Sequence, residues 1–120
     1  MARRKAAKNC DIRPWLSARA DCSEGRFLQI GNSLMLSKPF QVLSPGAQML
    51  YLCMALESGG RREFIFPRTA AKKYGVKPRS LLRYIDELSD AGFIDKTSLR
   101  NLRQPNEYSF SFRWKEERPP

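Results

Sequence analysis

Two proline–glycine pairs divide the middle of the chain into two short segments. Pro67 opens the first segment, which stops at Gly75, and Pro78 opens the second, which stops at Gly92. Proline suits the first turn of a helix, and a glycine directly after the last turn adopts the left-handed conformation that ends a helix. We therefore predict two short helices joined by a tight turn, over residues 68–74 and 78–91.

The residues around this turn have the spacing of a helix-turn-helix. Ala71 is small, as is needed where the second helix crosses close to the first. Gly75 then permits the turn, because glycine adopts backbone conformations that other residues avoid. Val76 follows and is expected to fill the gap between the two helices. The pattern predicts a helix-turn-helix unit.

The second predicted helix has one apolar and one polar face. Its apolar residues recur with the helical period, at Leu81, Tyr84, Ile85 and Leu88. With this stripe in the core, Arg79, Arg83 and Asp86 point outward, and Ser80 and Leu82 lie on the flanks. The outward face of the first turns is therefore basic.

The elements on either side follow from similar signals. Ser44 and Pro45 are a helix start, and the next residues are apolar on every face until Gly59, so we expect a central and nearly surrounded helix. Short strands are expected over residues 63–66, 93–97 and 107–114, with a polar loop at 98–106 closing a hairpin. From residue 44 to 114, the predicted order is helix, strand, helix, helix, strand, strand. The expected fold is mainly α with a small β-hairpin, an α+β domain.

Less regular segments are expected outside this domain. Residues 1–26 are predicted to be a basic, loosely ordered arm, in which Trp15 and Leu16 offer a point for local docking. Residues 27–43 contain a Gly-Asn turn signal and are expected to be extended or to form a short hairpin. Residues 115–120 are a tail.

The chain of 120 residues is strongly basic. It has 22 Lys and Arg against 12 Asp and Glu, a formal charge of +10 at pH 7, which favours a polyanionic partner. The sequence has no His, which excludes Ser-His-Asp and Cys-His catalytic sites and His-ligated metal. The three widely spaced cysteines are expected to be free thiols. We therefore expect no enzyme activity, no metal, no cofactor and no small-molecule ligand.

The sequence also bears on the compartment. No apolar stretch approaches the length of a transmembrane helix, and the basic start is not followed by the apolar run of a secretory signal. We expect a cytoplasmic protein that does not bind a membrane.

The segment from Pro67 to Ile94 resembles the winged helix-turn-helix of bacterial DNA-binding proteins. The resemblance covers the small residue, the Gly-Val turn, the second helix, and the Ala-Gly-Phe-Ile that enters a first wing strand. It implies that residues 44–114 are the whole winged-helix domain, with the wing at about 97–106. Residues 34–40 and 43–52 further resemble the N-terminal winged-helix module of replication initiators from plasmids and mobile elements of Gram-positive bacteria.

The resemblance and the charge pattern together predict a double-stranded DNA interface. The helix that begins at Pro78 would enter the major groove, where Arg79, Ser80 and Arg83 reach base edges. Other residues are expected to hold phosphates or to complete the interface: Arg68, Lys72, Lys73, Lys77, Arg100, Asn101 and Arg103.

Several interpretations stay open. Arg100 and Arg103 are either a wing along the DNA or the polar tip of a hairpin, and Asn101 is equally a turn former. The protein is either a transcriptional regulator or an accessory protein of replication or of a mobile element. A homodimer is expected if the DNA site is palindromic. The alternative function is a winged helix that binds another protein within a larger complex.

Two further patterns have structural interpretations. The aromatic residues that alternate in the last predicted strand are expected to pack one face of that strand on the helices, rather than to stack on bases: Tyr108, Phe110, Phe112 and Trp114. Glu87 and Asp90 lie on the polar side of their helix and are interpreted as surface charges.

Overall fold

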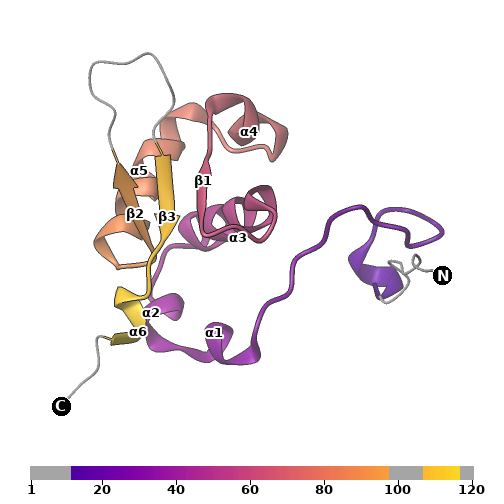
Figure 1. The fold of residues 1–120 in the computed structure, drawn as a ribbon, viewed down its shortest axis with the longest axis horizontal. Coiled ribbons are helices and arrows are strands. Elements are labelled where there is room, and N and C mark those ends of the chain that lie inside the picture. Colours follow the sequence, from indigo (N-terminus) through magenta and orange to yellow (C-terminus); the bar gives the residue numbers. More distant parts are fainter. Residues whose placement is uncertain (1–11, 98–106, 117–120) are drawn as a thin grey trace.

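Two helices, α3 (Pro45–Ser58) and α5 (Pro78–Asp90), pack against each other at the centre of the molecule. The computed structural model describes residues 12–97 and 107–116. In it, α3 contacts the strand β1 (Glu63–Ile65), and α5 contacts the strand β2 (Ile94–Thr97). The strand β3 (Glu107–Phe110) lies between these two, so that a small sheet covers one side of the helix pair (Figure 1).

From residue 44 to residue 110, the elements follow the predicted order. The helix α4 (Arg68–Lys73) stands between β1 and α5, and β2 and β3 come last. The sheet is antiparallel in the order β1-β3-β2, and Tyr108 of β3 is paired with Phe64 on one side and Lys96 on the other. The prediction of an α+β fold with a β2–β3 hairpin is confirmed.

The predicted start of the central helix is also confirmed. The Ser44 hydroxyl accepts a hydrogen bond from the Ala47 N–H at 3.3 Å, and Pro45 occupies the first turn. This is how an N-cap residue satisfies an amide that has no partner within the helix. Most of α3 is enclosed, but Met49 is 57% exposed, so the helix is not surrounded on every side.

Residues 27–43 were expected to be extended or to form a hairpin. This expectation is wrong for residues 32–41. Two short helices occupy this range, α1 (Asn32–Leu36) and α2 (Lys38–Gln41). The Ser37 hydroxyl caps α2 by accepting a hydrogen bond from the Phe40 N–H at 3.4 Å, and Pro39 lies in the first turn. Helix formation here places Phe40 in the core, where it is 2% exposed.

The last predicted strand is shorter than expected. It ends at Phe110, and the helix α6 (Arg113–Glu116) follows. The Ser111 hydroxyl accepts a hydrogen bond from the Arg113 N–H at 3.2 Å, which favours a turn over continued pairing. The expected single aromatic face is therefore broken after Phe110, because Phe112 turns outward and is 48% exposed.

Phe93 is the centre of an aromatic cluster that joins four parts of the chain. It is fully buried directly before β2, and its ring lies 5.1 Å from that of Tyr51 in α3 and 6.0 Å from that of Phe40 in α2. Trp114 of α6 stacks on it at 4.9 Å. The Trp114 contact gives a physical reason for the end of β3, since the chain turns back here to cover Phe93.

The N-terminal segment runs away from the helices and the sheet (Figure 1). It contains a short 3₁₀ helix, η2 (Pro14–Leu16), and Trp15 is 77% exposed, so the local docking offered by Trp15 and Leu16 does not form. Arg26 ties the segment to the end of α3, where its guanidinium donates to the carbonyl oxygens of Leu56 and Glu57 at 3.4 and 3.5 Å. The first eleven residues of the predicted arm lie outside the described part of the chain.

Candidate nucleic-acid interface

The turn between α4 and α5 has the predicted construction. Ala71 is 2% exposed, and its carbonyl oxygen accepts a hydrogen bond from the Val76 N–H at 2.8 Å. Gly75 has a φ of +80°, a value that a residue with a Cβ atom rarely adopts. Val76 packs against the core. These contacts hold the start of α5 at a defined position beside α4.

The outward and inward faces of α5 are those that the sequence predicts. Leu81, Ile85 and Leu88 are at most 6% exposed, whereas Arg79 and Arg83 are exposed. The Arg83 guanidinium lies 5.2 Å from the centre of the Tyr84 ring, an arrangement that holds the charge near the helix surface. The first two turns of α5 therefore present arginine side chains to solvent.

Ion pairing leaves this region positively charged. In residues 12–97 and 107–116, the ion pairs are Arg26–Glu57 at 3.9 Å, Lys73–Glu57 at 2.9 Å, Lys96–Asp86 at 2.8 Å and Arg113–Asp95 at 2.6 Å. Five exposed cations of α4, the turn and α5 take part in none of these pairs: Arg68, Lys72, Lys77, Arg79 and Arg83. We call these five residues the basic face.

Asp86 does not neutralise the arginines that share its helix. Its carboxylate accepts a hydrogen bond from the Lys96 ammonium of β2, which also raises the pKa of Lys96 above its ordinary value. The Asp86 carboxylate on the outward face therefore pairs with Lys96 of β2. The pair also links α5 to β2.

Lys73 has a different role from Lys72. Its ammonium pairs with Glu57 of α3, and the same carboxylate accepts a hydrogen bond from the Tyr74 hydroxyl at 2.9 Å. The hydrogen bond from Lys73 holds the pKa of Glu57 below its ordinary value. Burial and the hydrogen bond to Glu57 raise the pKa of Tyr74 to about 12. Lys73 thus connects α4 to α3, and we leave it outside the basic face.

Of the remaining predicted site residues, only Ser80 lies in the described part of the chain. Ser80 is half-buried on the flank of α5, close to the basic face in sequence. Arg100, Asn101 and Arg103 lie outside the described part of the chain.

The interpretation of Glu87 as a surface charge is wrong. Its two carboxylate oxygens accept hydrogen bonds from the Ser44 N–H and the Ser44 hydroxyl, each at 2.7 Å. The residue is half-buried and joins α5 to the start of α3. Sequence reasoning missed this contact because Ser44 lies 43 residues away, although a helix start with a free N–H is a site that favours a carboxylate. Asp90 is exposed.

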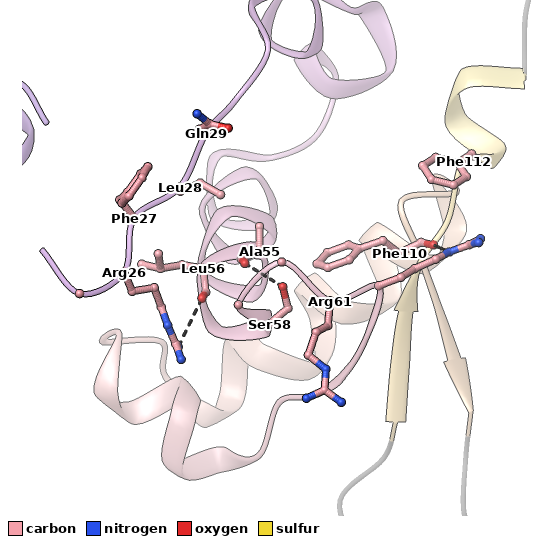
Figure 2. A pocket seen from close by; sticks show the side chains of 14 residues that line it. Arg26, Phe27, Leu28, Gln29, Ala55, Leu56, Ser58, Arg61, Phe110 and Phe112 are labelled. Carbon is pink, nitrogen blue, oxygen red and sulfur yellow. Dashed lines mark hydrogen bonds between the residues drawn. The ribbon is translucent and has the colours of Figure 1, made fainter. Parts of the chain in front are cut away.

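A groove of about 820 Å³ lies elsewhere on the molecule, at the end of α3. Figure 2 shows Phe27 and Leu28 of the N-terminal segment on one side of it, and Phe110 and Phe112 on the other. Arg62 donates to the Phe110 carbonyl oxygen at 2.9 Å and lies over the Phe112 ring. The groove is thus apolar with a basic edge.

No protein-family model, curated protein or solved structure matches the chain. None of the helices in the described part of the chain combines the length and the hydrophobicity that crossing a lipid bilayer requires. Among the same residues, no group of three or more potential metal ligands is found, and Cys22 and Cys53 are free. The candidate interface rests on the geometry and the charge of α4, the turn and α5.

Proposed function

We propose that the chain binds double-stranded DNA as a winged helix-turn-helix protein, with the basic face toward the duplex. The observation that carries the proposal is that the five exposed cations of the basic face have no acidic partner within the described residues. Cations that stay unpaired on α4, the turn and α5 are available to phosphates, and neutralising phosphates releases condensed counterions. The charge of the basic face therefore favours a partner that carries phosphates, such as duplex DNA.

The packing suggests how the duplex is bound. A single α-helix fits the major groove, and the buried stripe of α5 leaves its outward face free to enter. Arg79 and Arg83 would reach base edges, where arginine pairs with guanine through two hydrogen bonds. Arg68, Lys72 and Lys77 would hold phosphates on either side and set the position of the helix. The β2–β3 hairpin would be the wing, and Arg100, Asn101 and Arg103 would contact the DNA beside it.

The acidic residues of α5 are compatible with this position. Asp86 and Asp90 lie in the second half of the helix, away from the turn where Arg79 begins the outward face. The Lys96 ammonium compensates Asp86 at 2.8 Å, which reduces its repulsion of phosphates. The charge along α5 therefore favours entry of its N-terminal end.

Fluorescence anisotropy with a labelled duplex tests the proposal. If about five phosphates are neutralised, the logarithm of the binding constant falls against the logarithm of the salt concentration with a slope of roughly −4 to −5. Removing two charges with Arg79→Ala and Arg83→Ala should weaken binding strongly. The matched control combines Arg19→Ala with Arg61→Ala, which also removes two exposed charges, both outside the basic face. A slope near zero, or an equal effect of the control, contradicts the proposal.

The biological role that fits this interface is that of a cytoplasmic transcriptional regulator, or of an accessory protein for replication or a mobile element. Selection of binding sites from a random DNA pool separates these roles. A palindrome favours a homodimeric regulator, since half-site symmetry mirrors protein symmetry. Direct repeats favour an initiator-like role.

A second candidate function is a winged-helix module that binds another protein, and the groove at the end of α3 is the observation that favours it. Phe27 is 51% and Phe112 is 48% exposed there, and contiguous exposed apolar surface is typical of interaction sites. Peptides selected by display on the immobilised chain test this function. Phe112→Ala should abolish binding of such a peptide, and Arg83→Ala should leave it unchanged. This result would favour protein binding over DNA binding.

A further inference from the structure

Leu82 is an exposed apolar side chain at the edge of the outward face of α5. It is 64% exposed, whereas two leucines and one isoleucine of the same helix are buried in the core: Leu81, Ile85 and Leu88. It follows Arg79 by three residues and directly precedes Arg83. The basic face therefore has a single large apolar group among its charges on α5, within the described residues.

The position of Leu82 on the helix follows from its neighbours. Residues three and four apart on a helix lie side by side, so Leu82 is next to Arg79 in one direction and next to Asp86 in the other. Asp86 is held by Lys96 of β2. Leu82 thus lies on the hairpin side of the outward face, one turn closer to the start of α5 than the Asp86–Lys96 pair.

The chemistry of the major groove identifies what an aliphatic side chain at this position recognises. Base edges there present hydrogen-bond donors and acceptors, together with one apolar group, the C5 methyl of thymine. Arginine and serine read the polar groups, whereas leucine has neither donor nor acceptor. A leucine in the groove gains free energy only by removing apolar surface from water.

We propose that Leu82 contacts the C5 methyl group of a thymine and makes the protein prefer thymine at one position of its DNA site. The proposal rests on the proposed function, because it places α5 in the major groove. It adds a base preference that the arginines do not supply.

Replacing thymine by deoxyuridine tests the contact, since this change removes the methyl group and keeps every hydrogen-bonding group. The probe is a duplex carrying a site selected by the full chain from a random pool, with its thymines replaced one at a time. At one position, the wild-type protein should bind the deoxyuridine duplex about 3- to 10-fold more weakly, as expected for one buried methyl group. Leu82→Ala should bind both duplexes equally.

Leu36→Ala is the matched control, because Leu36 is also 64% exposed but lies in α1. It should keep the wild-type preference for thymine. Leu82→Met keeps an apolar side chain of similar size and should retain most of the preference for thymine. This second variant keeps the test valid if Leu82→Ala weakens binding to every duplex.

The two proposals fail in different ways. If the wild-type protein binds duplex DNA with the expected salt dependence but does not distinguish thymine from deoxyuridine at any position, the inference about Leu82 is overturned and the proposed function stands. The inference is also overturned if Leu82→Ala keeps the preference. If no duplex binds, both are overturned.

Discussion

The ring of Tyr84 lies against the backbone of Gly46, so closely that a Cβ atom on Gly46 would overlap it. Gly46 is in the first turn of α3, and Tyr84 is in the middle of α5, next to Arg83. The absence of a side chain at residue 46 therefore leaves room for the end of the Tyr84 side chain against the first turn of α3.

Replacing Gly46 with alanine should destabilise the fold, although alanine is the better helix former. The overlap forces the Tyr84 ring to move, and such overpacking should cost roughly 1–2 kcal/mol of unfolding free energy. Urea unfolding measures this loss. The loss should largely disappear when Gly46→Ala is made in a Tyr84→Leu background, and purely additive effects in this double-mutant cycle would contradict the packing described.

Phe93→Ala should be the most damaging single truncation of the aromatic cluster. Phe93 is fully buried and its ring contacts those of Phe40, Tyr51 and Trp114, so its removal leaves a cavity that several elements line. A loss of about 3–5 kcal/mol is expected for a truncation of this type. Thermal unfolding checks it, with the half-exposed Phe112→Ala as the control that should change stability little.

Lys72 and Lys73 are neighbours that should respond oppositely to substitution. Lys72→Ala removes an unpaired charge of the basic face, so the salt slope of DNA binding should become less steep by about 1, with stability unchanged within about 0.5 kcal/mol. Lys73→Ala breaks the pair with Glu57 and should lower stability by up to about 1 kcal/mol, because the Lys73 side chain is 58% exposed. Its salt slope should stay at the wild-type value. An exchange of these two results would place Lys73 in the interface instead.

Arg83→Ala should separate base reading from phosphate binding. If Arg83 pairs with a base, its loss should cost about 1–3 kcal/mol on a preferred site and relax the selection at that position. Competition assays with preferred and random duplexes measure both affinities. An equal loss on the two duplexes would make Arg83 a phosphate contact.

The fold should lose stability as the pH rises from about 10 to about 12, in part because of Tyr74. The fold raises the pKa of Tyr74 from 10.0 to about 12, so the unfolded chain releases this proton first. The stabilisation is complete below pH 10 and disappears as the pH passes the folded value. Tyr74→Phe should show a smaller alkaline loss in urea unfolding series. A loss equal to that of the wild-type protein would show that Tyr74 is not responsible.

The fold raises the pKa of other groups as well, which is why the comparison with Tyr74→Phe is needed. Burial raises the pKa of Tyr51, and the hydrogen bond to Asp86 raises that of Lys96. Both proteins contain these groups and should therefore lose some stability at alkaline pH. The difference between the two proteins isolates the contribution of Tyr74.

Local signals predicted most of the elements after residue 44. The start of α3 at Ser44 and Pro45, the turn at Gly75 and the end of α5 before Gly92 all depend on residues next to one another in sequence. The outward direction of Arg79 and Arg83 followed from the helical period of the buried stripe. These features were predictable because capping, turn formation and amphipathic packing act within a few residues.

Features that depend on distant partners were missed. The contact between Glu87 and Ser44 spans 43 residues, and no local pattern identifies it. Likewise, β3 stops because Trp114 packs on Phe93, so the alternation of residues 107–114 alone predicted a longer strand. The helix α2 is different, since Ser37 and Pro39 form a start signal like that of Ser44 and Pro45, and the signal was present in the sequence.

The two hydrogen bonds from Ser44 to Glu87 have a consequence for how the basic face of α5 can evolve. Because both are 2.7 Å long and converge on one carboxylate, α5 cannot rotate about its own axis without stretching them. The direction in which Arg79 and Arg83 point is thus linked to a serine outside α5, the N-cap residue of α3. Substitution of residue 44 or 87 would remove these hydrogen bonds and change the direction of the basic face, even with all five of its cations retained.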